Sequence, residues 1–495
     1  MEFGGRPFAA GRIADMPSFR PILFVVGILL VVLAGTMLVP AVVDWAAHNE
    51  DWRSFVIAAG FAAGVGTSGA IAAWTPHFQI RVRETFLITT ASWVVLALFG
   101  ALPFVLREHI GFTDAVFESM SGLTTTGSTV FTGLDNMPPG LLLWRSMLQW
   151  IGGVGIVVMA IMILPLLSVG GMQLFRAESS DRSEKIVAHP FYLAASIGAV
   201  YLVLTAACAL AYALAGMTFF DAVNHAMTTL STGGYSTHDA SLSFFDQPSI
   251  HWIAIVFMAA GSLPFVLYIK SVKGDWLALF RDQQVRGFFS MVSVAAICLT
   301  IWLYLKHWPL LSAVRQAVFN VTSIVTTTGY ASDDYSTWGT LPVSVFLMLT
   351  FLGGCTGSTA GAIKVFRLQI MLLMTREQLW RLLLPRIIYP RRYNGERVSD
   401  DIIPSVVAFL AAYIVVTAVI AVGLSAFGLD LITAISGAAT AIGNVGPGLG
   451  RIIGPAGNFA SLPDGAKWLL ILGMMLGRLE LFTVLVILTP AFWRA

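Results

Sequence analysis

Four short stretches rich in threonine and glycine interrupt a chain that is otherwise largely apolar. They read LTTTGST at 123–129, LSTGGYS at 230–236, VTTTGYA at 325–331 and, more weakly, ATAIGNV at 439–445. Hydroxyl and backbone carbonyl groups offer only oxygen, and glycine readily adopts the φ values that would turn successive carbonyls towards one axis. Four such strands around an axis would form rings of oxygen that replace the hydration shell of an alkali cation. The stretches therefore predict a cation filter.

Aligning the stretches places one glycine of each copy in a single column: Gly127, Gly234, Gly329 and Gly443. The predicted ion-binding residues surround this column, and they are Thr124, Thr125, Thr126, Gly127, Ser231, Thr232, Gly233, Gly234, Thr326, Thr327, Thr328, Gly329, Thr440, Ala441, Ile442, Gly443 and Asn444. Because the copies are unequal, we expect the filter to discriminate between alkali cations less sharply than four identical loops would. The alternative is that such runs are external turns or small-residue seams between helices. Four copies in register argue against it.

Each stretch follows a segment that is too short to cross a bilayer. Asp114, Asp221 and Asp430 stand thirteen residues before their glycine, and the third copy has Gln316 there. The ten residues from Asp114 to Leu123 would form a helix of about 15 Å, half the thickness of the hydrocarbon layer. Backbone that returns from that depth must be buried in protein or line a water-filled cavity. An aspartate suits the start of such a helix, and the C-terminal end of the helix would favour a cation at mid-membrane.

The composition places most of the chain in a membrane. Of its 495 residues, 57% are hydrophobic and 11% are charged, and its mean hydropathy is +0.80. A soluble protein could not bury that much apolar surface. The net charge of +2 gives no sign of nucleic-acid binding, and no CxxC, Cys/His or HExxH pattern points to a zinc site or an enzyme. The uncharged run 21–40 is longer than the core of a signal peptide, which predicts a retained span.

Long apolar runs predict an all-α polytopic membrane protein with ten spans. The spans are roughly 21–42, 54–74, 85–106, 142–168, 190–215, 251–270, 287–306, 341–373, 402–426 and 467–491. The predicted units are an N-terminal two-span hairpin, 1–80, and four span–pore loop–span repeats around a pseudo-fourfold pore, 81–185, 186–285, 286–400 and 401–495. Basic residues are concentrated in alternate connections. The positive-inside rule therefore predicts that both termini lie in the cytoplasm.

Two further features predict a gate. GGCTGSTAGAIK interrupts the overlong eighth span with glycines four residues apart, which indicates either an unwound loop or a close helix–helix seam. Arg478 lies about eleven residues from either end of the last span, too deep to reach the interface easily. It would be either a pore-facing cation that opposes ion passage or one half of an ion pair with another span. The predicted gate residues are Gly353, Gly354, Thr356, Gly357, Gly361, Lys364 and Arg478.

Longer motifs around these stretches resemble the TrkH/KtrB/HKT superfamily of potassium transporters, and most closely its TrkH branch. They are SGLTTTGSTV, WRSMLQWIGGVGIVVMAIMILPLL, GGMQLFRAE, TTLSTGGYST, VTTTGYASDDYSTW, LGGCTGSTAGAIK, IGNVGPG and GRLELFTVLVILTPAFW. The resemblance implies one pore per chain, a homodimer and a cytosolic TrkA-like nucleotide-binding regulatory ring. It also implies K⁺ as the transported ion, with no cofactor in this chain. In that superfamily a serine in the first filter position accompanies sodium permeation, so glycine in all four copies points to potassium.

We therefore expect potassium uptake across the bacterial inner (plasma) membrane, closed by the intramembrane loop and the pore arginine. The chain would contact membrane lipid, and the arginines at 376–397 would bind either a cytosolic partner or anionic lipid. The alternative is a secondary transporter that couples a solute to a cation through broken helices. Such folds often contain two inverted repeats, whereas four loops that enter from the same side argue for a pore.

Overall fold

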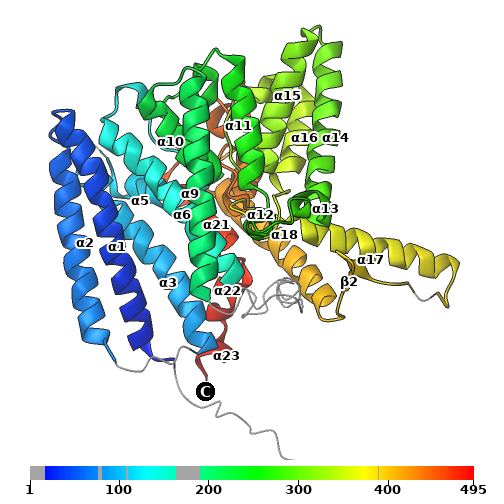
Figure 1. Ribbon diagram of the computed structural model, residues 1–495, viewed down its shortest axis with the longest axis horizontal. Coiled ribbons are helices and arrows are strands. Elements are labelled where there is room, and N and C mark those ends of the chain that lie inside the picture. Colours follow the sequence, from blue (N-terminus) through cyan, green and yellow to red (C-terminus); the bar gives the residue numbers. More distant parts are fainter. Residues whose placement is uncertain (1–16, 76–80, 108–109, 163–189, 388, 495) are drawn as a thin grey trace, which may run out of the picture.

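The computed structural model describes residues 17–75, 81–107, 110–162, 190–387 and 389–494, and its regular structure is almost entirely helical (Figure 1). The N-terminal hairpin consists of α1 (Phe19–Ala46) and α2 (Trp52–Ala73). These helices meet at glycines, since a Cβ on Gly27 would lie only 2.6 Å from the carbonyl oxygen of Gly66. Close backbone contact of this kind is a common way for helices to associate in a membrane.

A buried carboxylate joins the hairpin to the rest of the chain. Asp44, near the end of α1, is fully buried and accepts a hydrogen bond of 2.7 Å from the amide of Gly140. Gly140 lies in the first turn of α6 (Pro139–Met162), where backbone amides have no partner within the helix. Asp44 therefore satisfies such an amide from another helix and places its charge at the positive end of the α6 dipole.

The predicted repeats contain the same sequence of elements: a long helix, a shorter helix, a return segment and a further helix. Residues 81–185 contain α3 (Val82–Gly100), α4 (Leu102–Val105), α5 (Phe112–Leu123), η1 (Leu134–Asn136) and α6. Residues 186–285 contain α9 (Pro190–Leu214), α10 (Phe219–Leu230), η3 (Ser241–Phe244), α11 (Pro248–Gly261), α12 (Phe265–Val272) and α13 (Ala278–Arg281).

The second half of the chain follows the same order, with one more helix and a pair of short strands added at the end of the third repeat. The third repeat contains α14 (Gln283–Leu305), α15 (Leu310–Val325), η4 (Tyr335–Thr337), α16 (Thr340–Thr350), α17 (Val365–Leu383) and the antiparallel strands β1 (Arg392–Tyr393) and β2 (Glu396–Arg397). The fourth contains α18 (Ile402–Ala426), α19 (Leu431–Gly443), α20 (Gly450–Ile453), α21 (Asp464–Arg478), α22 (Phe482–Leu485), η5 (Val486–Leu488) and α23 (Pro490–Trp493).

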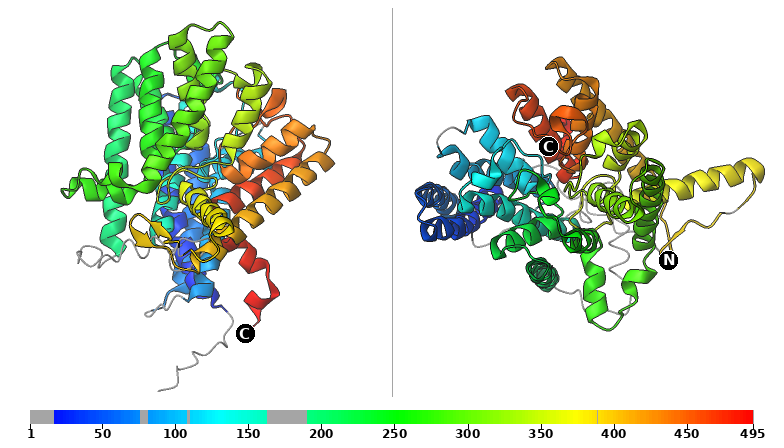
Figure 2. Two further views of the ribbon diagram at one scale, coloured as in Figure 1. Left: turned by 90° about the vertical axis from the view of Figure 1, so that its right-hand side faces the viewer. Right: turned by 90° about the horizontal axis from the view of Figure 1, so that it is seen from above.

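The structure confirms a polytopic helical fold, but three of the ten predicted spans are bent or divided. Seven spans among the described residues are single continuous segments: α1, α2, α3 with α4, α6, α9, α14 and α18. Two more are bent, α11 against α12 by 93° and α21 against α22 and η5 by 106°. The predicted span 341–373 is divided, because α16 has 11 residues and α17 leaves the bundle sideways (Figures 1 and 2). The end of the predicted fourth span, 163–168, lies outside the described residues.

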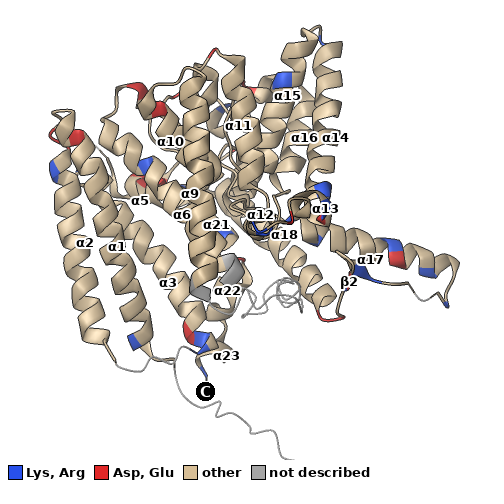
Figure 3. Cartoon of the chain, in the orientation of Figure 1, with Lys and Arg blue, Asp and Glu red and all other residues tan. Residues whose placement is uncertain are grey.

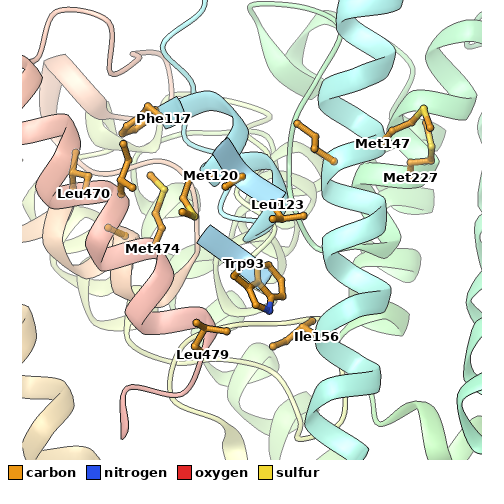
Figure 4. Packing of buried hydrophobic residues seen from close by; sticks show 14 of the residues in the cluster. Trp93, Phe117, Met120, Leu123, Met147, Ile156, Met227, Leu470, Met474 and Leu479 are labelled. Carbon is orange, nitrogen blue, oxygen red and sulfur yellow. The ribbon is translucent and has the colours of Figure 1, made fainter. Parts of the chain in front are cut away.

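The short helices α5, α10, α15 and α19 are held between the longer ones. α6 packs against both α5 and α10, and α21 packs against both α5 and α19. Figure 4 shows Met147 of α6 facing Met227 of α10, and Met474 of α21 approaching Met120 of α5. Each of these two long helices therefore contacts short helices from two different repeats.

Charged residues are scarce along the middle of the long helices and gather near their ends and along α17 (Figure 3). This distribution is what a hydrocarbon layer requires, since a charge at its centre is costly. On α17, the carboxylate of Glu377 is buried and pairs with Arg381 and with Arg391, each at 2.6 Å. Arg391 also pairs with Asp400, so this ion-pair cluster fastens the segment after α17 back onto the helix.

Candidate cation site

The four short helices end in the same backbone motif. One residue in each return segment has a left-handed backbone: Thr125 (φ 53°), Thr232 (φ 52°), Thr327 (φ 58°) and Asn444 (φ 52°). The next amide then bonds to the carbonyl five residues back, as from Thr126 to Ser121 at 2.8 Å, which is the Schellman arrangement. A β-branched residue in this region is strained, and strain of this kind is concentrated at functional sites.

A glycine with positive φ stands two residues after each left-handed residue. These glycines are Gly127 (φ 87°), Gly234 (φ 78°), Gly329 (φ 82°) and Gly446 (φ 109°). Glycine is required here because other residues rarely adopt such angles. The shared spacing shows that the four return segments have one backbone conformation.

The predicted glycine column is therefore wrong in its fourth member. Gly443 is the last residue of α19, and Gly446 takes the position of Gly127. Thr440, Ala441 and Ile442 consequently belong to the helix and not to the return segment. The aspartates caused the error: Asp430 caps α19 by accepting from the amide of Thr433, whereas Asp114 and Asp221 lie within the first turns of α5 and α10. Matching them shifted the alignment by three residues.

The four glycines approach one another's segments in a closed cycle. A Cβ on Gly127 would lie 2.1 Å from the carbonyl oxygen of Gly233, and one on Gly234 would lie 1.9 Å from that of Thr328. A Cβ on Gly329 would lie 2.1 Å from the carbonyl oxygen of Val445, and one on Gly446 would lie 2.8 Å from that of Thr126. Each repeat thus meets the next, and the fourth meets the first. The C-terminal ends of four helix dipoles, which carry partial negative charge, lead into this ring.

Side chains of the return segments hold one another in place. The hydroxyls of Thr124 and Thr126 are 2.7 Å apart, and those of Thr326 and Thr328 are also 2.7 Å apart. The amide group of Asn444 donates to the hydroxyl of Thr126 at 3.0 Å, which joins the fourth segment to the first. These hydroxyls therefore support the backbone.

A side chain from each of the first three short helices fixes the return segment that follows it. Glu118 accepts from the backbone amide of Val130 at 3.0 Å, and His225 lies 3.0 Å from the hydroxyl of Ser236. Asn320 donates to the hydroxyl of Ser332 at 3.0 Å. The chemistry differs from repeat to repeat, while the position, nine residues before the glycine of the ring, is the same.

The predicted gate residues other than Arg478 lie in a non-helical segment, 351–364, packed against the return segments. The amide of Gly361 donates to the hydroxyl of Thr327 at 2.7 Å. The hydroxyl of Thr232 donates to that of Thr359 at 3.1 Å. A Cβ on Gly353 would lie 2.1 Å from the carbonyl oxygen of Gly361, so the two ends of this hairpin-like segment touch. The strained threonines of the second and third repeats thus contact this segment directly.

Backbone groups of the same segment bind to neighbouring helices. The amide of Thr356 donates to Gln284 of α14 at 3.0 Å, and the carbonyl of Gly357 accepts from the amide of Phe265 in α12 at 3.0 Å. The carbonyl of Gly354 accepts from the amide of Val365 at 3.1 Å. The segment is therefore an ordered part of the interior and not a helix–helix seam.

One cation lies beside this segment, and another is its last residue. Arg478 is 3% exposed and donates from Nη1 to the carbonyl of Thr359 at 2.8 Å. Its Nε and Nη2 have no hydrogen-bond partner within the described part of the chain. Lys364 donates to the carbonyl of Ala360, and both cations line a cavity of about 20 Å³. Glu480, two residues after Arg478, pairs instead with Arg367 at 2.6 Å.

Sequence reasoning missed several residues of this site. Val445 and Gly446 carried a signal, because Asn tolerates the left-handed conformation and a second glycine follows two residues after Asn444. Arg145 and Gln149 gave a weaker one, as polar residues within an apolar span. Each of these two has a partner in the next repeat, which only the folded structure shows.

Known proteins of similar sequence and structure are membrane transporters. The profile of one family, TrkH, described as a cation transport protein, matches residues 53–494. The Trk system potassium uptake protein TrkI of Halomonas elongata is 46% identical over 486 residues, which is 98% of this chain and 99% of that protein. The TrkH protein of Escherichia coli is 38% identical over 96% of this chain and 99% of its own length. The crystal structure of the potassium transporter TrkH from Vibrio parahaemolyticus matches with a TM-score of 0.89 and 36% identity, covering 96% of this chain and all of that one.

Proposed function

The chain belongs to the TrkH family of cation transport proteins, and from this premise we propose that it takes up potassium across the bacterial plasma membrane. The observation that carries the proposal is the closed cycle of four glycine-containing return segments. Its backbone carbonyls would replace the water around a dehydrated K⁺, and four converging helix ends would favour the positive charge. A solute carrier coupled to a cation would need a site for the solute, and no feature described above offers one.

The proposed filter keeps the predicted residues of the first three repeats and revises the fourth. Its members are Thr124, Thr125, Thr126, Gly127, Ser231, Thr232, Gly233, Gly234, Thr326, Thr327, Thr328, Gly329, Asn444, Val445 and Gly446. The units 81–185, 186–285, 286–400 and 401–495 would each supply one quarter, and 1–80 would serve as a peripheral hairpin.

The proposed gate is the segment from Gly353 to Lys364 together with Arg478. The buried guanidinium of Arg478, whose Nε and Nη2 have no hydrogen-bond partner among the described residues, would oppose the passage of a cation, since a charge in a medium of low dielectric constant acts strongly at short range. The hydrogen bond between Arg478 and Thr359 supports a coupled movement of the two parts.

The remaining proposals concern orientation and partners. The arginines at 376–397 support a cytoplasmic location of α17 and of both termini, through the positive-inside rule. We also propose a homodimer, contact with anionic lipid, and a cytosolic TrkA-like nucleotide-binding ring as regulator.

Growth of a bacterium that lacks its own potassium uptake tests the function. The wild-type chain, expressed with its regulatory partner, should restore growth at limiting potassium. The Gly329→Ser variant should admit sodium and lower the preference for potassium, because it alters one quarter of the ring. Purified protein that conducts Na⁺ and K⁺ equally would refute the potassium assignment.

A further inference from the structure

Two polar side chains of α6, one turn apart, extend to the return segment of the following repeat. Gln149 is fully buried; its Nε2 donates to the carbonyl of Gly233 at 2.7 Å, and its Oε1 accepts from the amide of Tyr235 at 3.1 Å. Gln149 therefore binds the backbone on both sides of Gly234, the ring glycine of the second repeat.

Gln149 also fills the space of a missing side chain. The residue before the ring glycine is Thr126 in the first repeat and Thr328 in the third, but Gly233 in the second. A Cβ on Gly233 would lie 2.3 Å from the side-chain amide carbon of Gln149. In the first and third repeats a threonine hydroxyl supports this position from within the segment, whereas here the support comes from another repeat.

Arg145 contacts both the first and the second return segment through its guanidinium group. Its Nε donates to Glu118 at 2.7 Å, and its Nη1 donates to the carbonyl of Ser236 at 2.9 Å. Its Nη2 donates to the hydroxyl of Thr129 at 3.2 Å, and the guanidinium lies 4.1 Å from the centre of the Tyr235 ring. The side chains of Arg145 and Glu118 are 1% and 0% exposed, so this ion pair is buried within the protein.

Two other repeats lack these groups at the equivalent places. Three glycines mark the alignment, because a Cβ on Gly152, Gly261 or Gly477 would lie 1.8, 2.8 or 1.9 Å from the carbonyl oxygen near the end of the preceding short helix. Counting back three residues pairs Gln149 with Met258 and Met474. Counting back seven pairs Arg145 with Ala254 and Leu470. These side chains cannot donate a hydrogen bond to a neighbouring segment.

We infer that Arg145 and Gln149 are positioning residues that set the ion selectivity of the filter at the boundary between the first and second repeats. The inference rests on the proposed potassium filter. Because Gln149 holds the Gly233 carbonyl at a fixed place, that quarter of the ring cannot contract around Na⁺, which is smaller than K⁺. Loss of this hold would allow the contraction and lower the preference for K⁺.

The test is Gln149→Met, which gives this boundary the residue that the second and fourth repeats already have. The variant loses both hydrogen bonds of Gln149, and the loss of the one that fixes the Gly233 carbonyl, of ordinary strength, should lower the K⁺/Na⁺ permeability ratio roughly threefold to tenfold. The ratio is measured from reversal potentials of purified protein in liposomes, which do not depend on how much of the protein is active. Trp150→Phe is the matched control, since its indole donates to Thr205 of α9 at 3.2 Å and not to a return segment.

Gln149→Asn provides a second variant, which keeps the amide but is too short to reach both backbone partners. A lower ratio in either glutamine variant, with Trp150→Phe unchanged, supports the inference. A wild-type ratio in the variants that conduct, even with a lower melting temperature, refutes it and leaves only a structural role. A wild-type protein that conducts both ions equally refutes the proposed function instead. If neither glutamine variant conducts while Trp150→Phe does, the residues serve folding and the inference fails.

Discussion

The revised position of the fourth glycine makes a sharp prediction about two substitutions three residues apart. Gly446→Ala should lower potassium uptake at least tenfold, whereas Gly443→Ala should leave it nearly intact. The two changes add the same methyl group at neighbouring places in one repeat. They differ only in whether the residue belongs to the ring or to the helix before it.

The magnitudes follow from the backbone at each position. At Gly446 the φ of 109° is strained for alanine, which costs about 1–3 kcal/mol. The added Cβ would also lie 2.8 Å from the carbonyl oxygen of Thr126 and press on the ring. At Gly443 the backbone is helical, where alanine is favoured by about 1 kcal/mol, although contacts of 3.0 Å to Thr350 and Val445 offset part of this gain.

Uptake of Rb⁺ into cells starved of potassium measures the difference, with the amount of protein in the membrane determined in parallel. We expect at least a tenfold loss for Gly446→Ala, the equivalent of about 1.4 kcal/mol. Gly443→Ala should stay within about threefold of the wild type. If Gly443→Ala were inactive and Gly446→Ala active at equal protein levels, the assignment of the ring would be wrong.

Three more predictions concern other parts of the chain. Arg478→Ala should raise cation flux in liposomes, because it removes a buried cation beside the proposed pathway; unchanged flux in a well-folded variant would count against a gate. Asp44→Ala should lower the free energy of unfolding by about 1–3 kcal/mol by leaving the Gly140 amide unpaired, and an unchanged melting temperature in detergent would contradict this. A hydrogen bond with His238 holds the pKa of Asp135 below its usual value. The resulting stability is present above about pH 4 and is lost at lower pH, so Asp135→Asn should flatten the fall in melting temperature on acidification.

The sequence allowed the prediction of the polytopic helical fold and of the positions of three of the four return-segment glycines, for physical reasons. Apolar length determines a span, and Gly127, Gly234 and Gly329 follow helix-sized segments with the same spacing. The fourth quarter was misaligned because Asp430 acts as a cap and not as a first-turn residue. An aspartate is favourable both as the N-cap and in the first turn of a helix, so the sequence does not distinguish these two positions.

The contacts between repeats could not be predicted from the sequence, for a different reason. Arg145 and Gln149 look like isolated polar residues in an apolar helix, and their partners are up to 91 positions away along the chain. The bend between α11 and α12 falls at Pro264, whereas the hydrogen bond from the amide of Phe265 to Gly357 joins residues 92 positions apart. Pairings over such distances are decided by packing.

The dependence of the second return segment on Gln149 means that the four repeats are not interchangeable parts. The second repeat has glycine where the first has Thr126, and Gln149 of the first repeat fills that space. A copy of the second repeat at another place in the ring would lack this contact. The first and second repeats therefore form one structural unit at this boundary.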